Sequence, residues 1–260
     1  MVDGLEGKVA LVTGGTRGIG VAIVQRLLQL GCEVVTCGRK QPDHMEEVGG
    51  RRATFHAADI RDAAQARELV ESTVALRGRL DLVVNNAGGS PQAEAATASP
   101  RFSEAILALN LLAPLHVAQA AYPHLREAKG SVVNIASVSG RRPSPGTAIY
   151  GAAKAGLLSL TKSLAQEWGP EVRVNAIVVG LIETENSELT YGSHRAQERI
   201  AGSLPLERLG RGADIANAVA FLASPMAAYI SGAELAVDGG GERPLFLEIV
   251  AEEAALAGAI

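Results

Sequence analysis

The chain has 260 residues, of which 47% are hydrophobic, 20% charged and only 3% aromatic. It can therefore bury a core built mainly from Ala, Val, Leu and Ile, and it is too apolar to be disordered. A net charge of −4 without a basic stripe argues against a nucleic-acid partner, and two cysteines exclude a disulfide scaffold or a four-cysteine metal site. The N-terminus lacks a signal-peptide pattern and no apolar run reaches the length of a membrane span, so we expect a cytoplasmic protein without membrane contact.

Short apolar runs alternate with longer helical periodicity along the chain. Residues 8–13 predict a buried strand that leads into a glycine-rich turn, and the 3.6-residue spacing behind the turn predicts a helix ending at Gly31. Further strands are predicted near 33–37, 52–56, 80–84, 130–136, 172–178 and 234–237, and further helices near 62–77, 99–127, 150–168 and 214–223. This alternation predicts an α/β fold, a doubly wound parallel sheet in a three-layer α/β/α arrangement, as one domain over residues 1–260.

Two segments depart from the alternation. Residues 183–212 have weak periodicity over a length that favours a mobile lid above a site, the alternative being a surface excursion with a short helix. The tail, residues 242–260, is acidic and compatible with a helix, and its role is not predicted.

The turn after the first strand reads TGGTRGIG, from Thr13 to Gly20. Glycines permit positive φ angles and let backbone N–H groups approach a pyrophosphate at a helix N-terminus, so this placement favours nucleotide binding over a purely structural turn. The spacing of Gly14, Gly18 and Gly20 is three residues and then one, which differs from the commoner dinucleotide fingerprint.

Further motifs follow the turn in order: NNAG at 85–88, a lone Asn110, Ser137, YGAAK from Tyr150 to Lys154, and VDGG at 237–240. Tyr150 and Lys154 are four residues apart and share one helical face. With the glycine turn, these motifs resemble the compact single-domain branch of the short-chain dehydrogenase/reductase family, over about residues 5 to 241. The resemblance implies a Rossmann-like fold, a nicotinamide cofactor and interconversion of a carbonyl and an alcohol.

The chemistry of these residues can be argued from their types. Reduction of a ketone creates an alkoxide that needs a proton, and a phenol with a pKa of about 10 is a poor donor or base at neutral pH unless its anion is stabilised. We therefore expect Tyr150 to be the catalytic acid/base and Lys154 to lower its pKa and hold the nicotinamide ribose. Ser137 would donate a hydrogen bond to the carbonyl oxygen. The resemblance implies that Asn110 holds a water linking Lys154 to solvent, the alternative being a capping or packing residue.

The resemblance also implies the cofactor contacts. It places Asn86, Ala87 and Gly88 against the adenosine ribose. It places Asp59 and Ile60 against the adenine, the alternative for Asp59 being a helix N-cap. The loop after strand 172–178 keeps Gly180, Ile182 and Thr184 but has Val179 where the family usually has proline. The predicted cofactor set is Gly14, Thr16, Arg17, Gly18, Ile19, Gly20, Arg39, Asp59, Ile60, Asn86, Ala87, Gly88, Tyr150, Lys154, Gly180, Ile182 and Thr184.

Charge at the end of the second strand predicts which nicotinamide nucleotide binds. Enzymes that use NAD place an acid there to accept from the ribose 2′-hydroxyl, whereas this chain has Gly38 followed by Arg39. Arg17 is a second cation for a 2′-phosphate, and charge-assisted hydrogen bonds are the strong ones. We expect NADP(H) rather than NAD(H), the alternative being that both arginines are solvated. The five histidines show no ligand spacing, so we expect no metal.

Three functions remain open. The first is an NADP(H)-dependent oxidoreductase of a small-molecule ketone or secondary alcohol. The second is a 3-oxoacyl-thioester reductase, acting on an acyl carrier protein or CoA ester, for which Arg141 and Arg142 would be the anion-binding candidates unless they are a solvated pair. The third is a non-catalytic NADP(H)-sensing protein, which the retained Tyr150 and Lys154 argue against. By resemblance, helices 99–127 and 150–168 form a homodimer face, commonly within a homotetramer.

Overall fold

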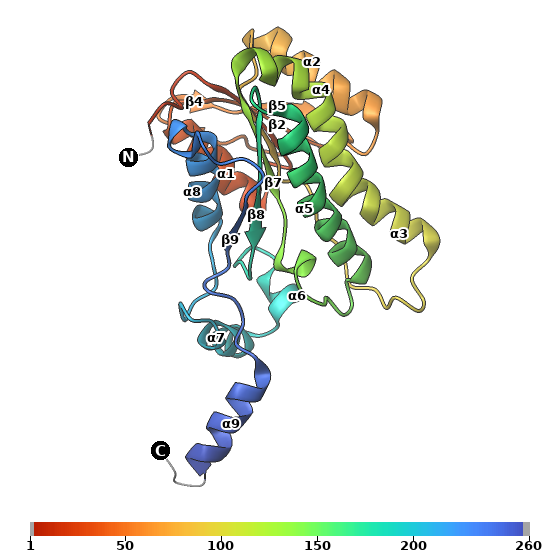
Figure 1. Cartoon of the computed structure of the whole chain (residues 1–260), viewed down its shortest axis with the longest axis vertical. Coiled ribbons are helices and arrows are strands. Elements are labelled where there is room, and N and C mark those ends of the chain that lie inside the picture. The colour runs from red at the N-terminus through yellow and green to blue at the C-terminus, as the bar shows by residue number, and fades with distance from the viewer. Residues whose placement is uncertain (1–2, 257–260) are drawn as a thin grey trace.

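A parallel seven-stranded sheet organises the chain, whose residues 3–256 are described by a computed structural model. The strand order is β5-β2-β1-β6-β7-β8-β9, so the order reverses between β1 and β6 (Figure 1). The strands are β1 (Val9–Thr13), β2 (Glu33–Gly38), β5 (Thr54–Ala57), β6 (Leu82–Asn85), β7 (Ser131–Ile135), β8 (Arg173–Val179) and β9 (Glu234–Val237). Open sheets of this kind bind ligands at the carboxyl ends of the strands, beside the reversal.

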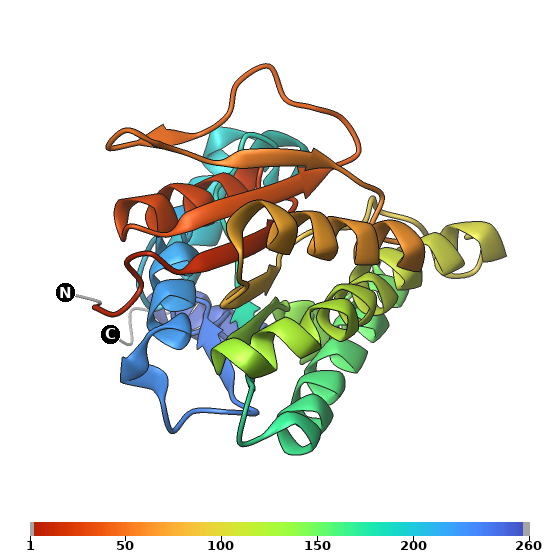
Figure 2. The same cartoon turned by 90° about the horizontal axis from the view of Figure 1, so that it is seen from above.

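Helices cover both faces of the sheet, which confirms the predicted doubly wound α/β/α fold (Figures 1 and 2). α1 (Gly18–Gln29) and α8 (Gly212–Ala223) pack on one face, and α2 (Ala63–Arg77), α4 (Ala113–Ala128) and α5 (Ala148–Trp168) pack on the other. Alternate residues of β1 enter the two cores, Ala10 and Val12 on the α1 side and Val9 and Leu11 on the α2 side. A central strand buried on both faces therefore reads as a continuous apolar run.

The predicted helix 99–127 contains a wider turn that the periodicity did not reveal. α3 (Pro100–Leu107) passes into a π-helical turn (Ala108–Leu112) before α4 begins. Pro114 lacks an N–H and its ring would crowd the carbonyl of Asn110 in a regular helix, so the wider turn relieves this position. Within residues 3–256, helix 100–128 is the only one long and apolar enough to cross a membrane. In this fold its inner side chains pack in the core beside α2.

A short hairpin replaces the start of the predicted strand 52–56. β3 (Glu47–Val48) and β4 (Arg51–Arg52) pair in an antiparallel manner, and β5 begins only at Thr54. Gly49 and Gly50 join them with φ angles of +60° and +76°, which a two-residue hairpin turn requires. The Gly-Gly pair was the sequence signal for this turn.

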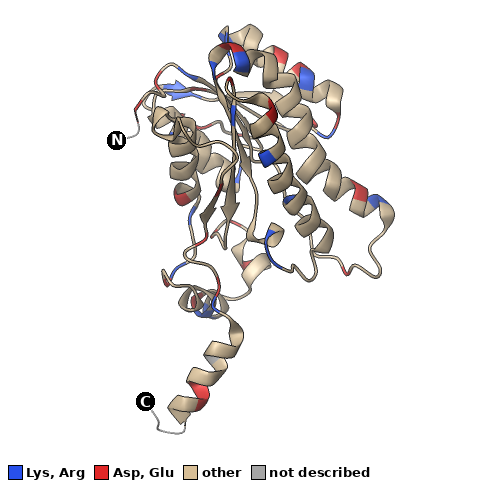
Figure 3. Ribbon diagram, in the orientation of Figure 1, with Lys and Arg blue, Asp and Glu red and all other residues tan. Residues whose placement is uncertain are grey.

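The two segments outside the alternation are partly helical. Segment 183–212 contains α6 (Ser187–Tyr191) and α7 (His194–Ser203), and the tail contains α9 (Leu245–Leu256), which projects away from the body (Figure 1). Residues 1–2 and 257–260, which the predicted domain and tail include, lie outside the described residues. Acidic and basic residues are interspersed along the ribbon in Figure 3.

Candidate active site

The glycine-rich turn between β1 and α1 is fixed by a threonine from β2. The Gly15 N–H donates to Thr36 Oγ1 at 2.9 Å, and that hydroxyl donates to the Val12 carbonyl at 2.7 Å. A Cβ on Gly15 would lie 2.4 Å from the same oxygen, so only glycine fits beneath Thr36. The sequence analysis missed Thr36, whose polar side chain inside a buried strand was the available signal.

Asn86 fixes the same turn from the opposite side. Its Nδ2 donates to the Thr13 carbonyl at 2.9 Å and to the Gly14 carbonyl at 3.0 Å. Thr13 Oγ1 in turn accepts from the backbone N–H groups of Asn86 and Ala87, each at 3.0 Å. The NNAG loop is thus fastened to the turn. The side chain of Asn86 faces the turn backbone, and its predicted contact with adenosine stays a prediction.

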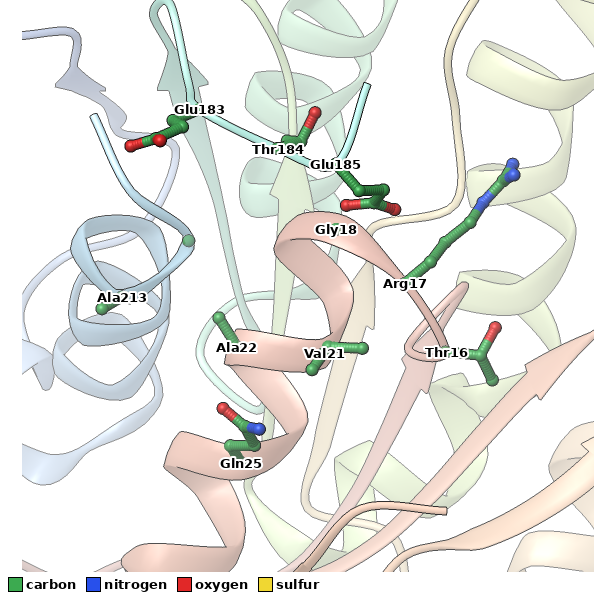
Figure 4. Close-up of a pocket in the computed structure, with 11 residues that line it drawn as sticks. Thr16, Arg17, Gly18, Val21, Ala22, Gln25, Glu183, Thr184, Glu185 and Ala213 are labelled. Carbon is green, nitrogen blue, oxygen red and sulfur yellow. The ribbon is translucent and has the colours of Figure 1, made fainter. Parts of the chain in front are cut away.

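A groove of about 460 Å³ opens beside the N-terminus of α1 (Figure 4). Its lining includes Thr16, Arg17, Gly18, Thr184 and Glu185. α1 has no acidic residue in its first turn, and no side chain among the described residues caps it from Arg17. Its first N–H groups and the positive end of its dipole are therefore free for an anion. The turn fits a dinucleotide diphosphate on these grounds.

Ser137, Tyr150 and Lys154 come together at the carboxyl end of β7. Ser137 begins the 3₁₀ turn Val138–Gly140, and Tyr150 and Lys154 lie in the first turns of α5. Lys154 Nζ is 5.6 Å from the centre of the Tyr150 ring, and the Ser137 side chain is close enough to Tyr150 to act on the pKa of that residue. The structure therefore brings three of the four predicted catalytic side chains into one cluster.

Two glycines allow the 3₁₀ turn to lie directly on α5. A Cβ on Gly140 would be 2.8 Å from the carbonyl carbon of Lys154, and a Cβ on Gly151 would be 2.8 Å from the carbonyl oxygen of Ser139. This backbone contact fixes the distance between Ser137 and the helix that carries Tyr150. Neither Gly140 nor Gly151 was predicted from the sequence as a site residue.

Asn110 connects the cluster to the NNAG loop. Its Oδ1 accepts from the Gly89 N–H at 2.9 Å, and its Nδ2 donates to the carbonyls of Gly89 and Ile106, both at 3.0 Å. A Cβ on Gly88 would lie 2.7 Å from Asn110 Oδ1 and 3.2 Å from Lys154 Nζ. Asn110 and Lys154 thus adjoin the same glycine, while the water-holding role of Asn110 stays a prediction.

Burial sets the proton affinity of Tyr150. Its pKa is raised by loss of solvent, and the Ser137 side chain opposes this rise only in part. Burial acts against the expected lowering of the Tyr150 pKa by Lys154, and that effect of Lys154 stays a prediction. Tyr150 is protonated at neutral pH, which is the form a proton donor needs.

Lys154 is almost completely buried, with 3% of its surface exposed, and its Nζ donates to the Ile135 carbonyl at 2.7 Å. Burial lowers its pKa from 10.5 to about 8. The side chain is therefore an ammonium below about pH 8 and loses this charge above it.

This lowered pKa leads to a pH prediction. If the Lys154 ammonium supports catalysis, kcat/KM, which reports groups of the free enzyme, falls as the pH rises through about 8. A pH profile of initial rates at low substrate concentration measures the effect. A profile that stays flat through this range would contradict the role given to the ammonium group.

Asp59 is not the helix N-cap. Asp62 caps α2, accepting from the N–H groups of Ala64 at 2.8 Å and Gln65 at 3.3 Å. The Asp59 carboxylate instead accepts from Arg61 Nε at 2.8 Å, and this guanidinium lowers the pKa of Asp59. The alternative reading of Asp59 as a cap is wrong, and the adenine contact of Asp59 and Ile60 stays a prediction.

The two predicted phosphate-binding arginines are exposed at the ends of neighbouring elements. Arg39 follows β2 directly and lies close enough to Asp59 for its charge to contribute to the lowered pKa of that carboxyl. Arg17 lines the groove, is exposed, and extends away from α1 (Figure 4). A Cβ on Gly38 would approach Thr16 Oγ1 at 3.8 Å, so the end of β2 lies beside the glycine turn.

The loop after β8 accommodates valine where the family usually has proline. β8 runs through Val179, which pairs with Val237, and the next N–H, that of Gly180, donates to the Val237 carbonyl at 3.1 Å. A Cβ on Gly180 would lie 2.6 Å from Asp238 Cα, so this glycine packs directly on the VDGG motif. Val179 therefore serves as the last residue of the strand, and the loop begins at Gly180.

A second tyrosine that the sequence analysis missed, Tyr191, lies beside this loop. Its hydroxyl accepts from the Ile182 N–H at 3.1 Å and donates to the Ile182 carbonyl at 3.2 Å. Thr184 is tied to the start of α6, because its N–H donates to Ser187 Oγ at 2.8 Å. No periodicity or motif pointed to Tyr191, since its role depends on how segment 183–212 folds back.

Comparisons with known proteins agree with this arrangement. A family model described as "Enoyl-(Acyl carrier protein) reductase" matches residues 14–242. A ketoacyl reductase of the granaticin polyketide synthase from Streptomyces violaceoruber is 39% identical over 244 residues, which cover 92% of this chain and 97% of that protein. Ligand-free aldohexose dehydrogenase from Thermoplasma acidophilum superimposes with a TM-score of 0.86 at 29% identity, over 92% of this chain and 96% of that one. A blue fluorescent protein from a metagenomic library, solved with NADPH, superimposes with a TM-score of 0.80 at 34% identity, over 91% and 98%.

Proposed function

The chain belongs to the short-chain dehydrogenase/reductase family, and from this premise we propose that it is an NADP(H)-dependent reductase of a small-molecule ketone with Tyr150 as its acid. Family membership makes it an oxidoreductase that interconverts a carbonyl and an alcohol. The proposal that Tyr150 is the acid of a ketone reductase rests on one observation, the cluster of Ser137, Tyr150 and Lys154 beside the NNAG loop and the glycine turn.

Each side chain of the cluster has a distinct role in the proposal. The bound nicotinamide nucleotide supplies the hydride for reduction or accepts it in the reverse direction. Ser137 donates a hydrogen bond to the carbonyl oxygen and so favours negative charge on it. Tyr150, protonated at neutral pH, delivers its hydroxyl proton to that oxygen. Lys154 stabilises the phenolate that remains and binds the ribose, since its Nζ adjoins Gly88 of the NNAG loop.

The preference for NADP(H) over NAD(H) rests on the end of β2. Gly38 leaves space where an acid would repel a 2′-phosphate, and Arg39 and Arg17 are exposed beside it. The other proposed cofactor contacts follow the loops already described: the glycine turn for the diphosphate, Asp59 and Ile60 for the adenine, and Gly180, Ile182 and Thr184 for the nicotinamide. NADPH in a solved relative supports the same choice.

The Arg39→Ala variant tests this preference. Loss of one charge-assisted contact is expected to lower the ratio of kcat/KM with NADPH to kcat/KM with NADH by about tenfold. Steady-state rates with both nucleotides measure this ratio. Arg67→Ala, at an exposed arginine of α2, is the matched control and should leave the ratio unchanged. An unchanged ratio in Arg39→Ala would contradict the proposal that Arg39 binds the 2′-phosphate of NADP(H).

The 3-oxoacyl-thioester reductase is the second candidate, because the granaticin relative is a ketoacyl reductase. An anionic carrier would need free cations near the site. Arg141 instead pairs with Glu234 at 2.8 Å, and Arg142 pairs with Glu242 at 2.5 Å. These pairs neutralise both candidate arginines, which favours a small-molecule ketone over a carrier-bound one. The retained Tyr150 and Lys154 argue against a cofactor-sensing protein without activity.

The family is usually oligomeric, and we extend the proposal to the assembly. We place the contact of a homodimer, within a homotetramer, on α3–α4 and α5, where Leu112 is exposed on the π turn. Segment 183–212 is proposed as the lid of the site. Cytoplasmic localisation fits the free, buried thiols of Cys32 and Cys37.

A further inference from the structure

The lid segment holds its own side chains at two places that the proposed cofactor needs. We propose that Tyr191 competes with the nicotinamide carboxamide for the backbone of Ile182, and that Glu185 competes with the diphosphate at the start of α1. Cofactor binding would then have to lift both side chains. The inference rests on the proposed function, in which Ile182 contacts the nicotinamide and the glycine turn contacts the diphosphate.

The contact of Tyr191 has the hydrogen-bonding pattern of a carboxamide. One hydroxyl accepts from the Ile182 N–H at 3.1 Å and donates to the Ile182 carbonyl at 3.2 Å. A primary amide offers the same two functions, an oxygen that accepts and an NH₂ group that donates. The Tyr191 hydroxyl and a carboxamide therefore exclude each other at Ile182.

The position of Tyr191 places this contact inside the site. The side chain is partly buried, and burial raises its pKa, with the charge of Glu242 acting in the same direction. Tyr191 is also close enough to Tyr150 to raise the pKa of that residue. Glu242 in turn forms the ion pair with Arg142, from the loop that follows Ser137. Tyr191 thus lies between the nicotinamide loop and the catalytic tyrosine.

Glu185 lies near the start of the same segment, six residues before Tyr191. Both of its carboxylate oxygens lie 3.8 Å from the position of a Cβ on Gly18, at the N-terminus of α1. Figure 4 shows this carboxylate near Gly18, on the loop between β8 and α6 that lines the groove. A diphosphate bound at the free N–H groups would meet a like charge at this point, so Glu185 lowers its affinity as long as the segment stays in place.

Because Tyr191 and Glu185 compete with different parts of the cofactor, their removal is expected to change the affinity for different sets of ligands. Removal of the Tyr191 hydroxyl affects only ligands that carry a nicotinamide. Removal of the Glu185 charge affects every ligand with a 5′-phosphate. When a side chain occupies the site in part of the molecules, the apparent Kd equals the intrinsic Kd divided by the fraction of molecules in which the site is open.

The experiment measures dissociation constants of the full chain, without substrate, for NADPH and for 2′,5′-ADP, which carries the 2′- and 5′-phosphates but no nicotinamide. Tyr191→Phe is expected to lower the Kd for NADPH by about threefold or more and to leave the Kd for 2′,5′-ADP unchanged. Glu185→Gln is expected to lower both. Tyr229→Phe, at a fully exposed tyrosine, is the control and should change neither.

The outcomes separate this inference from the proposed function. If wild-type protein binds neither ligand, the proposed function fails. If it binds NADPH but Tyr191→Phe leaves that Kd unchanged, raises it, or lowers the Kd of both ligands equally, the competition at Ile182 is wrong. If Glu185→Gln leaves both constants unchanged, the competition at α1 is wrong. Thermal melting of each variant confirms that the fold is retained.

Discussion

The Tyr150→Phe variant is expected to lose about 10²- to 10⁴-fold in kcat, because in the proposed mechanism its phenol delivers the proton to the reduced carbonyl oxygen. The ring remains in place and the variant loses only the hydroxyl that lies near Ser137. Binding of NADPH should therefore stay within about twofold of wild type, since the loss of one partly compensated hydrogen bond is small. Steady-state turnover and equilibrium titration of NADPH measure the two quantities separately.

The control for this variant is Tyr229→Phe, which removes the hydroxyl of a fully exposed tyrosine and should leave turnover unchanged. If Tyr150→Phe retains turnover, the acid lies elsewhere in the site. Tyr191 would then be the first alternative, because its charge state influences that of Tyr150.

The Gly20→Ala variant should disrupt the cofactor turn. The new Cβ would lie 2.2 Å from the Gly14 carbonyl oxygen and 2.7 Å from Asn86 Nδ2, and the first of these is backbone that cannot rotate away. We expect the free energy of unfolding to fall by about 1–3 kcal/mol, as for other overpacked positions. The Kd for NADPH should rise by about tenfold or more, because the turn must shift. Thermal melting and NADPH titration measure both effects.

The predicted loss of stability in Gly20→Ala is opposite to the effect that helix propensity alone would have. Alanine forms helix better than glycine by about 1 kcal/mol, so helix propensity alone would stabilise the variant. Gly202→Ala in α7 supplies the control, since a Cβ there meets nothing within 4 Å and should not destabilise the protein. A Gly20→Ala variant as stable as wild type, with unchanged NADPH affinity, would mean that the turn tolerates a side chain.

The alternation of strands and covering helices along the chain was predictable from the sequence, because a parallel sheet buried on both faces produces continuous apolar runs. β1 is the clearest case, with Ala10 in one core and Leu11 in the other. The cluster of Ser137, Tyr150 and Lys154 was also predictable, since β7 and α5 are adjacent in the chain and the tyrosine and lysine are one helical turn apart.

Features that depend on contacts between distant residues were not predictable. The π turn lies directly before Pro114, and periodicity alone does not distinguish it from α-helix. The ion pairs of Arg141 and Arg142 join residues about a hundred positions apart. The pKa of Tyr150 depends on burial in the folded protein, which the spacing of Tyr150 and Lys154 does not contain.

The contact of Tyr191 within the candidate site also could not be predicted from the sequence. The weak periodicity of 183–212 indicated a lid, but not which of its side chains would turn back toward the site. The contact of Tyr191 with Ile182 requires α6 to fold under the loop after β8, and no motif encodes this geometry. A binding site assembled from loops is therefore less visible in sequence than one assembled from strand ends and helix starts.

The measurement that tests the central claim most directly is oxidation of NADPH by the wild-type protein over a small panel of carbonyl compounds, with Tyr150→Phe as the blank. The panel contains an acetoacetyl thioester, a cyclic ketone, a steroid ketone, a diketone and a quinone. We predict that at least one small-molecule ketone is reduced well above the blank. Turnover confined to the thioester would select the acyl-thioester reductase instead. Equal rates in wild type and Tyr150→Phe for every compound, with NADPH bound to both, would contradict catalysis by this cluster.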